Sequence, residues 1–318
     1  MLDFALLPTP IEPARRLARA LDMDDDALWV KRDDLTGVGG GGNKVRKLVH
    51  LAADALAQGC DVFVTGGGRQ SNHCRTTAAV ANRLGVDCVL VMSSDPVEVP
   101  SGNVLLDVLF GAALEWVGPV GYHELNAAID DAAARLRDAG RRPYAMPIGG
   151  ASPVGERGYV DAAAELQAQV ADIELVVTAG GSGGTHAGLA MGFGDHARVL
   201  GVDVGARPDL AEFVAAAAVG AAGHVQVDSS QVGEGYAEPT ATGREAADLF
   251  ARCEGLILDP VYTAKAAAGL VAARREGRIE RDTRTVFLHT GGLPALFSPR
   301  FAEWVVGAAG LEPPPAQR

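Results

Sequence analysis

Short apolar runs rich in β-branched residues alternate along the chain with longer alanine-rich stretches. Residues 61–68, 87–93 and 174–180 are runs of the first kind, and residues 122–139 are a long stretch of the second. Apolar runs of this length, separated by helical patterns, are typical of buried strands that alternate with helices. The pattern therefore predicts an α/β fold with mostly parallel sheets.

The chain is long enough for two lobes. Its 318 residues are 48% hydrophobic, so it can bury a large core. A glycine-rich segment near 150–158 interrupts the strand–helix pattern and is a plausible boundary. No apolar run reaches membrane-spanning length, and the first residues lack a basic region followed by an apolar stretch. We therefore expect a cytoplasmic protein.

Charge and cysteine usage exclude two classes of site. A net charge of -12, with no cluster of lysine and arginine, argues against nucleic-acid binding. The cysteines show no paired spacing of the kind that holds a metal, and most lie in apolar or helical contexts. We interpret them as reduced thiols and predict no metal site: Cys60, Cys74, Cys88 and Cys253.

Lysine is scarce in this chain. Of the 28 basic residues only four are lysines: Lys31, Lys44, Lys47 and Lys265. The stretch GGGGNKVRKL places two of them directly after four glycines. Arginine cannot perform amine chemistry because its guanidinium group does not deprotonate. A lysine retained beside a flexible backbone is therefore a candidate for such chemistry.

A second glycine loop, 180–185, lies between an apolar strand pattern and a helical pattern. Free backbone N–H groups at the start of a helix, flanked by hydroxyls, suit a phosphate group. A tight turn needed only for packing is the simpler alternative. The same residues also satisfy the G-x-S-x-G pattern of hydrolases, and Asp259 and His289 follow Ser182 in the order of a catalytic triad. A serine hydrolase is therefore the alternative from a different functional class.

Three further segments end an apolar run with polar residues and glycines. Ser71, Asn72 and His73 open a helical pattern after one such run, where free N–H groups suit a carboxylate, although a simple N-cap would also explain Ser71 or Asn72. Tyr262 and Thr263 precede an alanine-rich helix, and His289 and Thr290 end the last run. An amine, a phosphate cradle and a partner for a ring nitrogen are what pyridoxal 5′-phosphate requires.

Several motifs, in this order, resemble one family. They are LPTPIEPARRL, LWVKRDDLTG, GGNKVRKL, QSNH, GSGGTHAGL, DPVYT and HTGGLPALF. Together they resemble the D-cysteine desulfhydrases and 1-aminocyclopropane-1-carboxylate deaminases, pyridoxal-phosphate enzymes of the tryptophan synthase β-like fold (fold type II). The resemblance implies two lobes, each a mostly parallel sheet flanked by helices, with the cofactor between them. The large lobe would comprise 1–45 and 156–318, and the small lobe 46–155.

The resemblance also implies residue roles. Lys44 would be the Schiff-base lysine, Asn72 would contact the phenolic oxygen of the cofactor, and Tyr262 would be the active-site phenol. Ser71 would help to hold the substrate carboxylate. The phosphate would be bound by the loop residues Gly181, Ser182, Gly183, Gly184 and Thr185.

Further roles follow from the same resemblance. Thr290 is the first choice for the partner of the cofactor ring nitrogen, with Thr263 second. Gln70 and His73, beside Ser71, would complete the substrate site. The family is expected to form a symmetric homodimer that acts on a small amino acid.

The departures from the family pattern concern the substrate. The deaminases have glutamate where this chain has Thr263 and glutamine where it has His73, so the pattern is closer to the desulfhydrases. We therefore expect β-elimination from D-cysteine to pyruvate, ammonia and sulfide, and rank 1-aminocyclopropane-1-carboxylate deamination lower. Arg69 stands where an aliphatic residue is usual. It would either face a second anionic group, as in L-cysteate sulfo-lyase activity, or pair on the surface.

Overall fold

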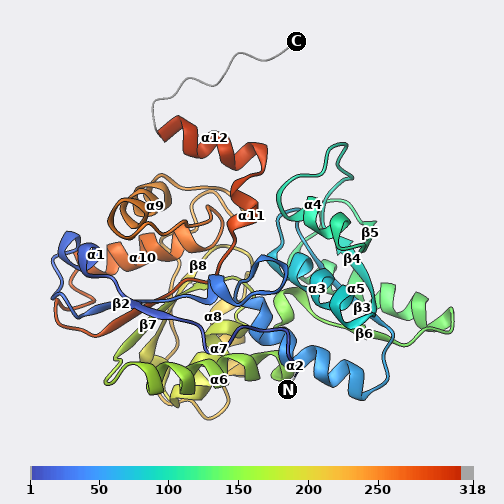
Figure 1. The fold of residues 1–318 in the computed structure, drawn as a ribbon, viewed down its shortest axis with the longest axis horizontal. Coiled ribbons are helices and arrows are strands. Elements are labelled where there is room, and N and C mark those ends of the chain that lie inside the picture. The colour runs from blue at the N-terminus through green and yellow to red at the C-terminus, as the bar shows by residue number, and fades with distance from the viewer. Residues whose placement is uncertain (1, 309–318) are drawn as a thin grey trace.

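The structure, a computed structural model, describes residues 2–308 and contains two sheets (Figure 1). The larger sheet has six strands in the order β1-β2-β10-β7-β8-β9, and the smaller has four in the order β5-β4-β3-β6. All neighbours are parallel except the antiparallel pair β1–β2. The predicted α/β class with mostly parallel sheets is confirmed.

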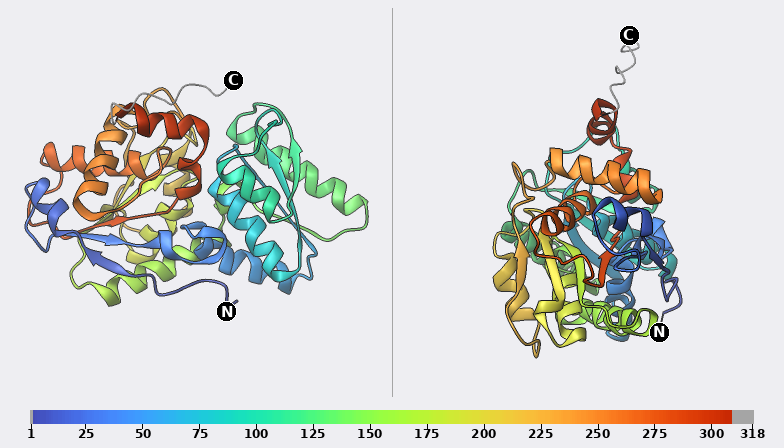
Figure 2. Two further views of the ribbon diagram at one scale, coloured as in Figure 1. Left: turned by 45° about the horizontal axis from the view of Figure 1, so that its top comes forward. Right: turned by 90° about the vertical axis from the view of Figure 1, so that its left-hand side faces the viewer.

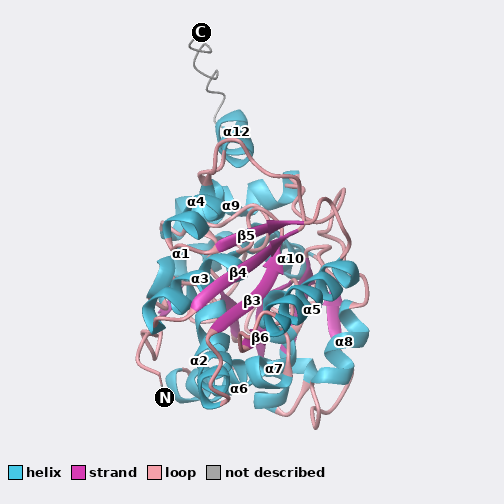
Figure 3. Ribbon diagram, turned by 90° about the vertical axis from the view of Figure 1, so that its right-hand side faces the viewer, coloured by secondary structure: helices cyan, strands magenta, loops and turns pink. Residues whose placement is uncertain are grey.

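The strands are short and come from separate parts of the chain. The larger sheet consists of β1 (Ile11–Pro13), β2 (Leu28–Lys31), β7 (Leu175–Gly180), β8 (Val199–Asp203), β9 (Gln226–Asp228) and β10 (Thr285–Leu288). The smaller consists of β3 (Val62–Gly67), β4 (Asp87–Met92), β5 (Ala113–Trp116) and β6 (Pro143–Ala145), which Figure 3 shows as adjacent arrows.

Helices cover both faces of each sheet. They are α1 (Arg15–Ala20), α2 (Lys44–Ala57), α3 (Asn72–Leu84), α4 (Gly102–Leu109), α5 (Tyr122–Asp138), α6 (Pro153–Gln169), α7 (Gly184–Phe193), α8 (Leu210–Ala217), α9 (Ala241–Glu254), α10 (Thr263–Arg275), α11 (Leu293–Leu296) and α12 (Pro299–Ala308). Figure 2 shows the two groups of helices and strands side by side. None of the helices within residues 2–308 is long and apolar enough to cross a membrane.

Alternation of side chains along each strand builds the cores. In β3, Phe63 packs with the apolar residues of α2 and α3, whereas Val62 and Val64 pack with Leu125 and Ile129 of α5. Successive strand residues point to opposite faces, so an uninterrupted apolar run is needed when both faces are covered. The larger sheet is covered in the same way by α1, α9 and α10 on one face and by α6 and α7 on the other.

The two halves meet where α2 packs on α6. Gly158 of α6 allows this approach, because a Cβ atom there would lie 2.4 Å from the carbonyl oxygen of Arg46 on α2. The predicted lobe limits, after 45 and after 155, fall within these two helices. They stay a prediction.

Candidate active site

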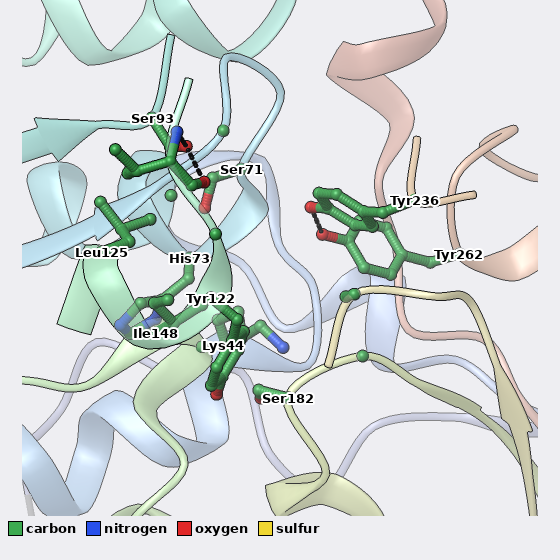
Figure 4. A pocket seen from close by; sticks show the side chains of 17 residues that line it. Lys44, Ser71, His73, Ser93, Tyr122, Leu125, Ile148, Ser182, Tyr236 and Tyr262 are labelled. Carbon is green, nitrogen blue, oxygen red and sulfur yellow. Dashed lines mark hydrogen bonds between the residues drawn. The ribbon is translucent and has the colours of Figure 1, made fainter. Parts of the chain in front are cut away.

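A cavity of about 170 Å³ lies between the two sheets (Figure 4). Gly67 and Gly68, at the carboxyl end of β3, line it from one side, and Gly181 and Ser182, which follow β7, line it from the other. Ligands of parallel α/β proteins bind at this end of the strands. Lys44 and three tyrosines also line the cavity: Tyr122, Tyr236 and Tyr262.

The glycine stretch before Lys44 is a tight turn with its backbone in the left-handed region. Gly41 has a φ of 69°, and a Cβ atom there would lie 2.1 Å from the carbonyl oxygen of Asp34. The hydroxyl of Thr36 accepts from the N–H of Gly42 at 2.8 Å and holds the end of the turn. Lys44 is therefore placed as the first residue of α2, with its side chain pointing into the cavity.

The amine of Lys44 forms no hydrogen bond with another residue in the range 2–308, and it faces the cavity. Burial lowers the pKa of Lys44 to about 8, because a charged ammonium loses hydration there. About a tenth of the amine is then neutral at pH 7, several hundred times more than for an ordinary lysine. The group is thus prepared to act as a nucleophile or a base.

The loop after β7 has the form of an anion site. Gly183, with a φ of 90°, caps α7 without any side-chain hydrogen bond, so the first N–H groups of this helix have no cap partner. A Cβ atom at Gly183 would lie 2.5 Å from the ring of Phe213. Thr185 accepts a hydrogen bond from the amide of Asn43 at 3.0 Å, which links the loop to the residue before Lys44.

Lys47 adds a positive charge beside this loop. It is fully buried and donates to the carbonyl oxygen of Gly149 at 3.1 Å. A Cβ atom on Gly184 would lie 2.7 Å from its amine. Burial and the neighbouring Lys44 hold its pKa well below the ordinary value, so an anion in the loop would stabilise its charged form. Sequence reasoning considered Lys47 only as a neighbouring charge that favours the neutral form of Lys44, and did not foresee its place beside the phosphate loop.

Ser71 and Asn72 begin α3 beside the cavity. Ser71 is the N-cap, accepting from the N–H of Cys74 at 3.2 Å. The amide oxygen of Asn72 accepts from Asn103 at 2.9 Å, which leaves its NH₂ group free to donate. Asn103, on α4, was not foreseen from the sequence, because nothing in its local pattern marks it.

His73 is buried with no hydrogen-bond partner within residues 2–308 at either ring nitrogen. Burial, and then Lys44 and Lys47, hold its pKa well below the ordinary value, so the ring is neutral. His73 contributes to the lining of the cavity that Lys44 also lines, while both of its ring nitrogens stay buried.

Two tyrosines form the wall opposite Lys44 (Figure 4). The hydroxyls of Tyr236 and Tyr262 are 2.5 Å apart, and their rings meet edge to face. Burial raises the pKa of Tyr262 well above its ordinary value and that of Tyr236 to about 12, so both are protonated at neutral pH. Tyr236 was missed because it lies in a loop without regular structure; its glycine-rich flank, GEGY, is the only signal.

Two predicted residues lie outside this group. Gln70 uses its amide to accept from the N–H of Asn103 at 2.8 Å and to donate to the carbonyl oxygen of Ser101 at 3.1 Å. The hydroxyl of Thr263 donates to Asp259 at 2.7 Å and is fully buried at the start of α10. Both are therefore used for structure. Of the two threonines proposed for the ring nitrogen, only Thr290 lines the space next to Lys44.

The hydrolase triad is not formed. Asp259 accepts from the N–H groups of residues 261–263, and His289 contacts the carbonyl oxygen of Ile257 at 3.1 Å and the N–H of Gly291 at 3.2 Å. Neither side chain is hydrogen-bonded to Ser182. The serine hydrolase alternative is wrong, because both of its partner groups are committed to backbone.

The remaining residues fit pyridoxal phosphate. Lys44 would bind its aldehyde, and the 181–185 loop would hold its phosphate. The side-chain amide of Asn72 would contact its ring hydroxyl, and Thr290 its ring nitrogen. The structure shows three features that suit the cofactor. The amine of Lys44 has no hydrogen-bond partner within residues 2–308, α7 begins without a side-chain cap, and Gly41 and Gly183 leave no room for a Cβ atom.

Comparison with known proteins agrees with this chemistry. The family model described as "Pyridoxal-phosphate dependent enzyme" matches residues 2–291. A crystal structure of an ACC deaminase homologue is 34% identical, covering 96% of this chain and 95% of its own, with a TM-score of 0.86.

Two more distant structures share the fold. The processed form of threonine deaminase isoform 2 from Solanum lycopersicum is 19% identical, with a TM-score of 0.69 over 98% of this chain and 85% of its own. A pyridoxal 5′-phosphate-dependent aspartate racemase is 15% identical, with a TM-score of 0.63 over 90% and 89%. The chain belongs to the family of pyridoxal-phosphate-dependent enzymes of fold type II, and is a lyase or deaminase that uses pyridoxal 5′-phosphate.

Proposed function

We propose that the protein removes the β-substituent of a small amino acid, with D-cysteine as the preferred substrate and pyruvate, ammonia and sulfide as the products. The observation that carries this proposal is the pair of hydrogen-bonded, protonated tyrosines opposite Lys44. A base on one side of the substrate and an acid on the other is the arrangement that elimination requires.

In this proposal the chain's own residues divide the work. Ser71 and the first N–H groups of α3 hold the substrate carboxylate. When bound, the cofactor supplies an electron sink for the negative charge that develops at the α-carbon. The amine of Lys44 removes the α-proton, and Tyr262 gives a proton to the departing sulfur. Tyr236 donates to Tyr262 or accepts from it, and so keeps that hydroxyl turned toward the substrate.

Thr290 favours elimination over reactions that need a stronger electron sink. A hydroxyl is a weak partner for a pyridine nitrogen, whereas a carboxylate would keep that nitrogen protonated. The sequence has Thr263 and His73 where the deaminases have glutamate and glutamine, which favours the desulfhydrase reaction within the family. Deamination of 1-aminocyclopropane-1-carboxylate remains the second candidate, because the 34% identical structure is described as an ACC deaminase homologue.

Arg69 argues against L-cysteate as the preferred substrate. Its side chain is exposed and donates to the carbonyl oxygen of Asp95 at 3.1 Å. It lines an adjoining hollow, shared with Arg300, but does not line the cavity around Lys44 itself. The β-sulfonate of L-cysteate bound in the cavity around Lys44 would therefore lack this positive charge.

A substrate screen tests the proposal. The purified enzyme, loaded with cofactor, is mixed separately with D-cysteine, L-cysteine, L-cysteate, D-serine and 1-aminocyclopropane-1-carboxylate, and pyruvate, 2-oxobutyrate and sulfide are measured. We expect pyruvate and sulfide in equal amounts from D-cysteine at the highest kcat/KM. 2-Oxobutyrate from the cyclopropane substrate, with no sulfide from D-cysteine, would instead identify a deaminase.

Capture of the cofactor by the apoenzyme should depend on pH through Lys44. Only a neutral amine attacks an aldehyde, and the pKa of Lys44 is lowered to about 8. The capture rate should therefore rise about tenfold per pH unit below 8 and level off above it. Stopped-flow absorbance after mixing with pyridoxal phosphate measures this rate. A rate still rising steeply at pH 10 would show an ordinary lysine.

We also propose a homodimer, formed through an apolar face near the glycine turn. Leu6, Leu35, Ile257 and Leu293 line one shallow hollow and are each more than 40% exposed. Light scattering should give twice the chain mass, and Leu293→Lys should reduce it, whereas Val219→Lys, a control at another exposed apolar residue, should not. The cytoplasmic location expected from the sequence stays a prediction.

A further inference from the structure

Lys265 lies away from the cavity but is tied to one of its walls. It is the third residue of α10 and is fully buried. Its amine donates to the carbonyl oxygen of Val232 at 2.7 Å and to that of Gly235 at 3.0 Å. The next residue in the chain is Tyr236. The ammonium group therefore binds the backbone of the segment that immediately precedes Tyr236, one of the two tyrosines opposite Lys44.

The segment that Lys265 binds, residues 229–240, contains no helix or strand. It packs on the turn after β8, where a Cβ atom at Gly205 would lie 3.2 Å from the backbone nitrogen of Tyr236. Gly235 has a φ of 145°, a conformation that favours glycine. A segment with so few internal hydrogen bonds needs an external partner to hold one conformation.

The same helix carries the second phenol. Tyr262 is the N-cap of α10, three residues before Lys265. Its backbone is fixed by Asp259, which accepts from the N–H of Tyr262 at 3.0 Å. One end of α10 thus holds Tyr262 directly and Tyr236 through the two carbonyl groups that Lys265 binds.

We propose that Lys265 is a positioning residue for the tyrosine pair: its charged hydrogen bonds to residues 232 and 235 place Tyr236 at hydrogen-bonding distance from Tyr262. Hydrogen bonds from a charged donor are about twice as strong as neutral ones, which suits a segment held at two points. Burial lowers the pKa of Lys265, and the charges of Glu238 and Asp203 oppose that effect. Its effect on turnover rests on the proposed function, but its effect on the tyrosines does not.

Tyrosine NMR tests the placement without substrate. The chain has five tyrosines, so ¹³Cζ labelling gives five resonances, and Tyr236→Phe and Tyr262→Phe assign the two of interest. In Lys265→Met both of these resonances should shift or broaden, because the hydroxyl pair separates. Those of Tyr122, Tyr144 and Tyr159 should stay in place. Arg275→Met, at the exposed end of the same helix, should move none of the five.

If Lys265→Met does not fold, Lys265→Gln replaces it, because an uncharged amide can still donate to the same carbonyl groups. It should produce a smaller shift of the same two resonances. All five resonances unchanged in either folded variant, or all five displaced together, would overturn the proposal. The first result would show that the tyrosines are held without Lys265, and the second that its role is general to the fold.

Kinetics on the substrate found by the screen provide the second readout. Lys265→Met should lower kcat by on the order of 100-fold, the usual cost of misplacing a catalytic group, with KM changed less than about threefold. The double variant with Tyr236→Phe should be no slower than Tyr236→Phe alone, because both changes remove the same interaction. Losses that multiply in the double variant would contradict the proposal even if the NMR result agreed.

Discussion

Replacing Lys44 with alanine should abolish turnover, lowering kcat by about 10⁴-fold or more, the upper end of what a general base contributes. The residue carries two roles in the proposed reaction, since its amine holds the cofactor and removes the α-proton. No other lysine can substitute. Lys47 is engaged with Gly149, and Lys31 and Lys265 are buried elsewhere.

The attachment itself is measurable without substrate. After borohydride reduction the mass of the wild-type chain should increase by one cofactor, and that of Lys44→Ala should not. Lys44→Arg is the matched control, because it keeps a positive charge at the cavity but cannot form the bond. Loss of attachment in both variants would identify the amine as the essential group. Retained attachment or turnover in either would disprove the assignment.

Replacing Arg46 with alanine should lower the free energy of unfolding by about 3–5 kcal/mol, the cost of removing one partner from a buried ion pair. Arg46 is buried and contacts two carboxylates, Asp33 at 2.8 Å and Glu165 at 2.9 Å. Asp33 also accepts from the hydroxyls of Tyr159 and Thr9. Without Arg46, the fully buried carboxylate of Asp33 would keep the hydrogen bonds from Tyr159 and Thr9 but lose those from Arg46 together with its counter-charge.

Urea unfolding of the two proteins measures this difference. Arg19→Ala is the matched control, because the Arg19–Asp25 pair is more than half exposed and should change the unfolding free energy very little. Equal unfolding free energies of the wild type and Arg46→Ala would contradict this prediction. They would show that the buried network helps to define one folded conformation without stabilising it.

At acid pH the difference in unfolding free energy between the wild type and Arg46→Ala should become smaller. Burial alone would raise the pKa of Asp33, but the charge and hydrogen bonds of Arg46 outweigh it and hold that pKa below the ordinary value. The stabilisation is therefore complete above the ordinary pKa of about 4 and is lost as the pH falls through the lower, folded-state value.

The sheets and most of the cavity could be predicted from the sequence because both depend on local pattern. The strands at 62–67, 87–92 and 175–180 are largely apolar runs, and the glycine-rich stretches at 39–42 and 181–184 mark the turns. Parallel strands bring their carboxyl ends together, so the segments that follow them had to meet.

What could not be predicted depends on contacts between distant segments. Tyr236 reaches the cavity from an irregular loop, held by a lysine 29 positions further on the chain. Gln70 and Thr263 have the right chemistry at the right place in the chain, but backbone partners that only the folded structure supplies take up their polar groups. The short strand β2 was also not assigned, since it has only four residues, ends in Lys31 and is followed at once by charged residues.

The burial of lysine has a practical consequence for handling the protein. All four lysines lie within the described residues, and three of them have 0% exposure, whereas Lys44 alone is partly accessible. Amine-reactive dyes, cross-linkers and coupling resins react with exposed lysines on most proteins. Here the only accessible lysine side chain within the described residues is that of Lys44, which the proposed reaction needs. Such reagents should therefore behave as inactivators, and immobilisation should use another chemistry.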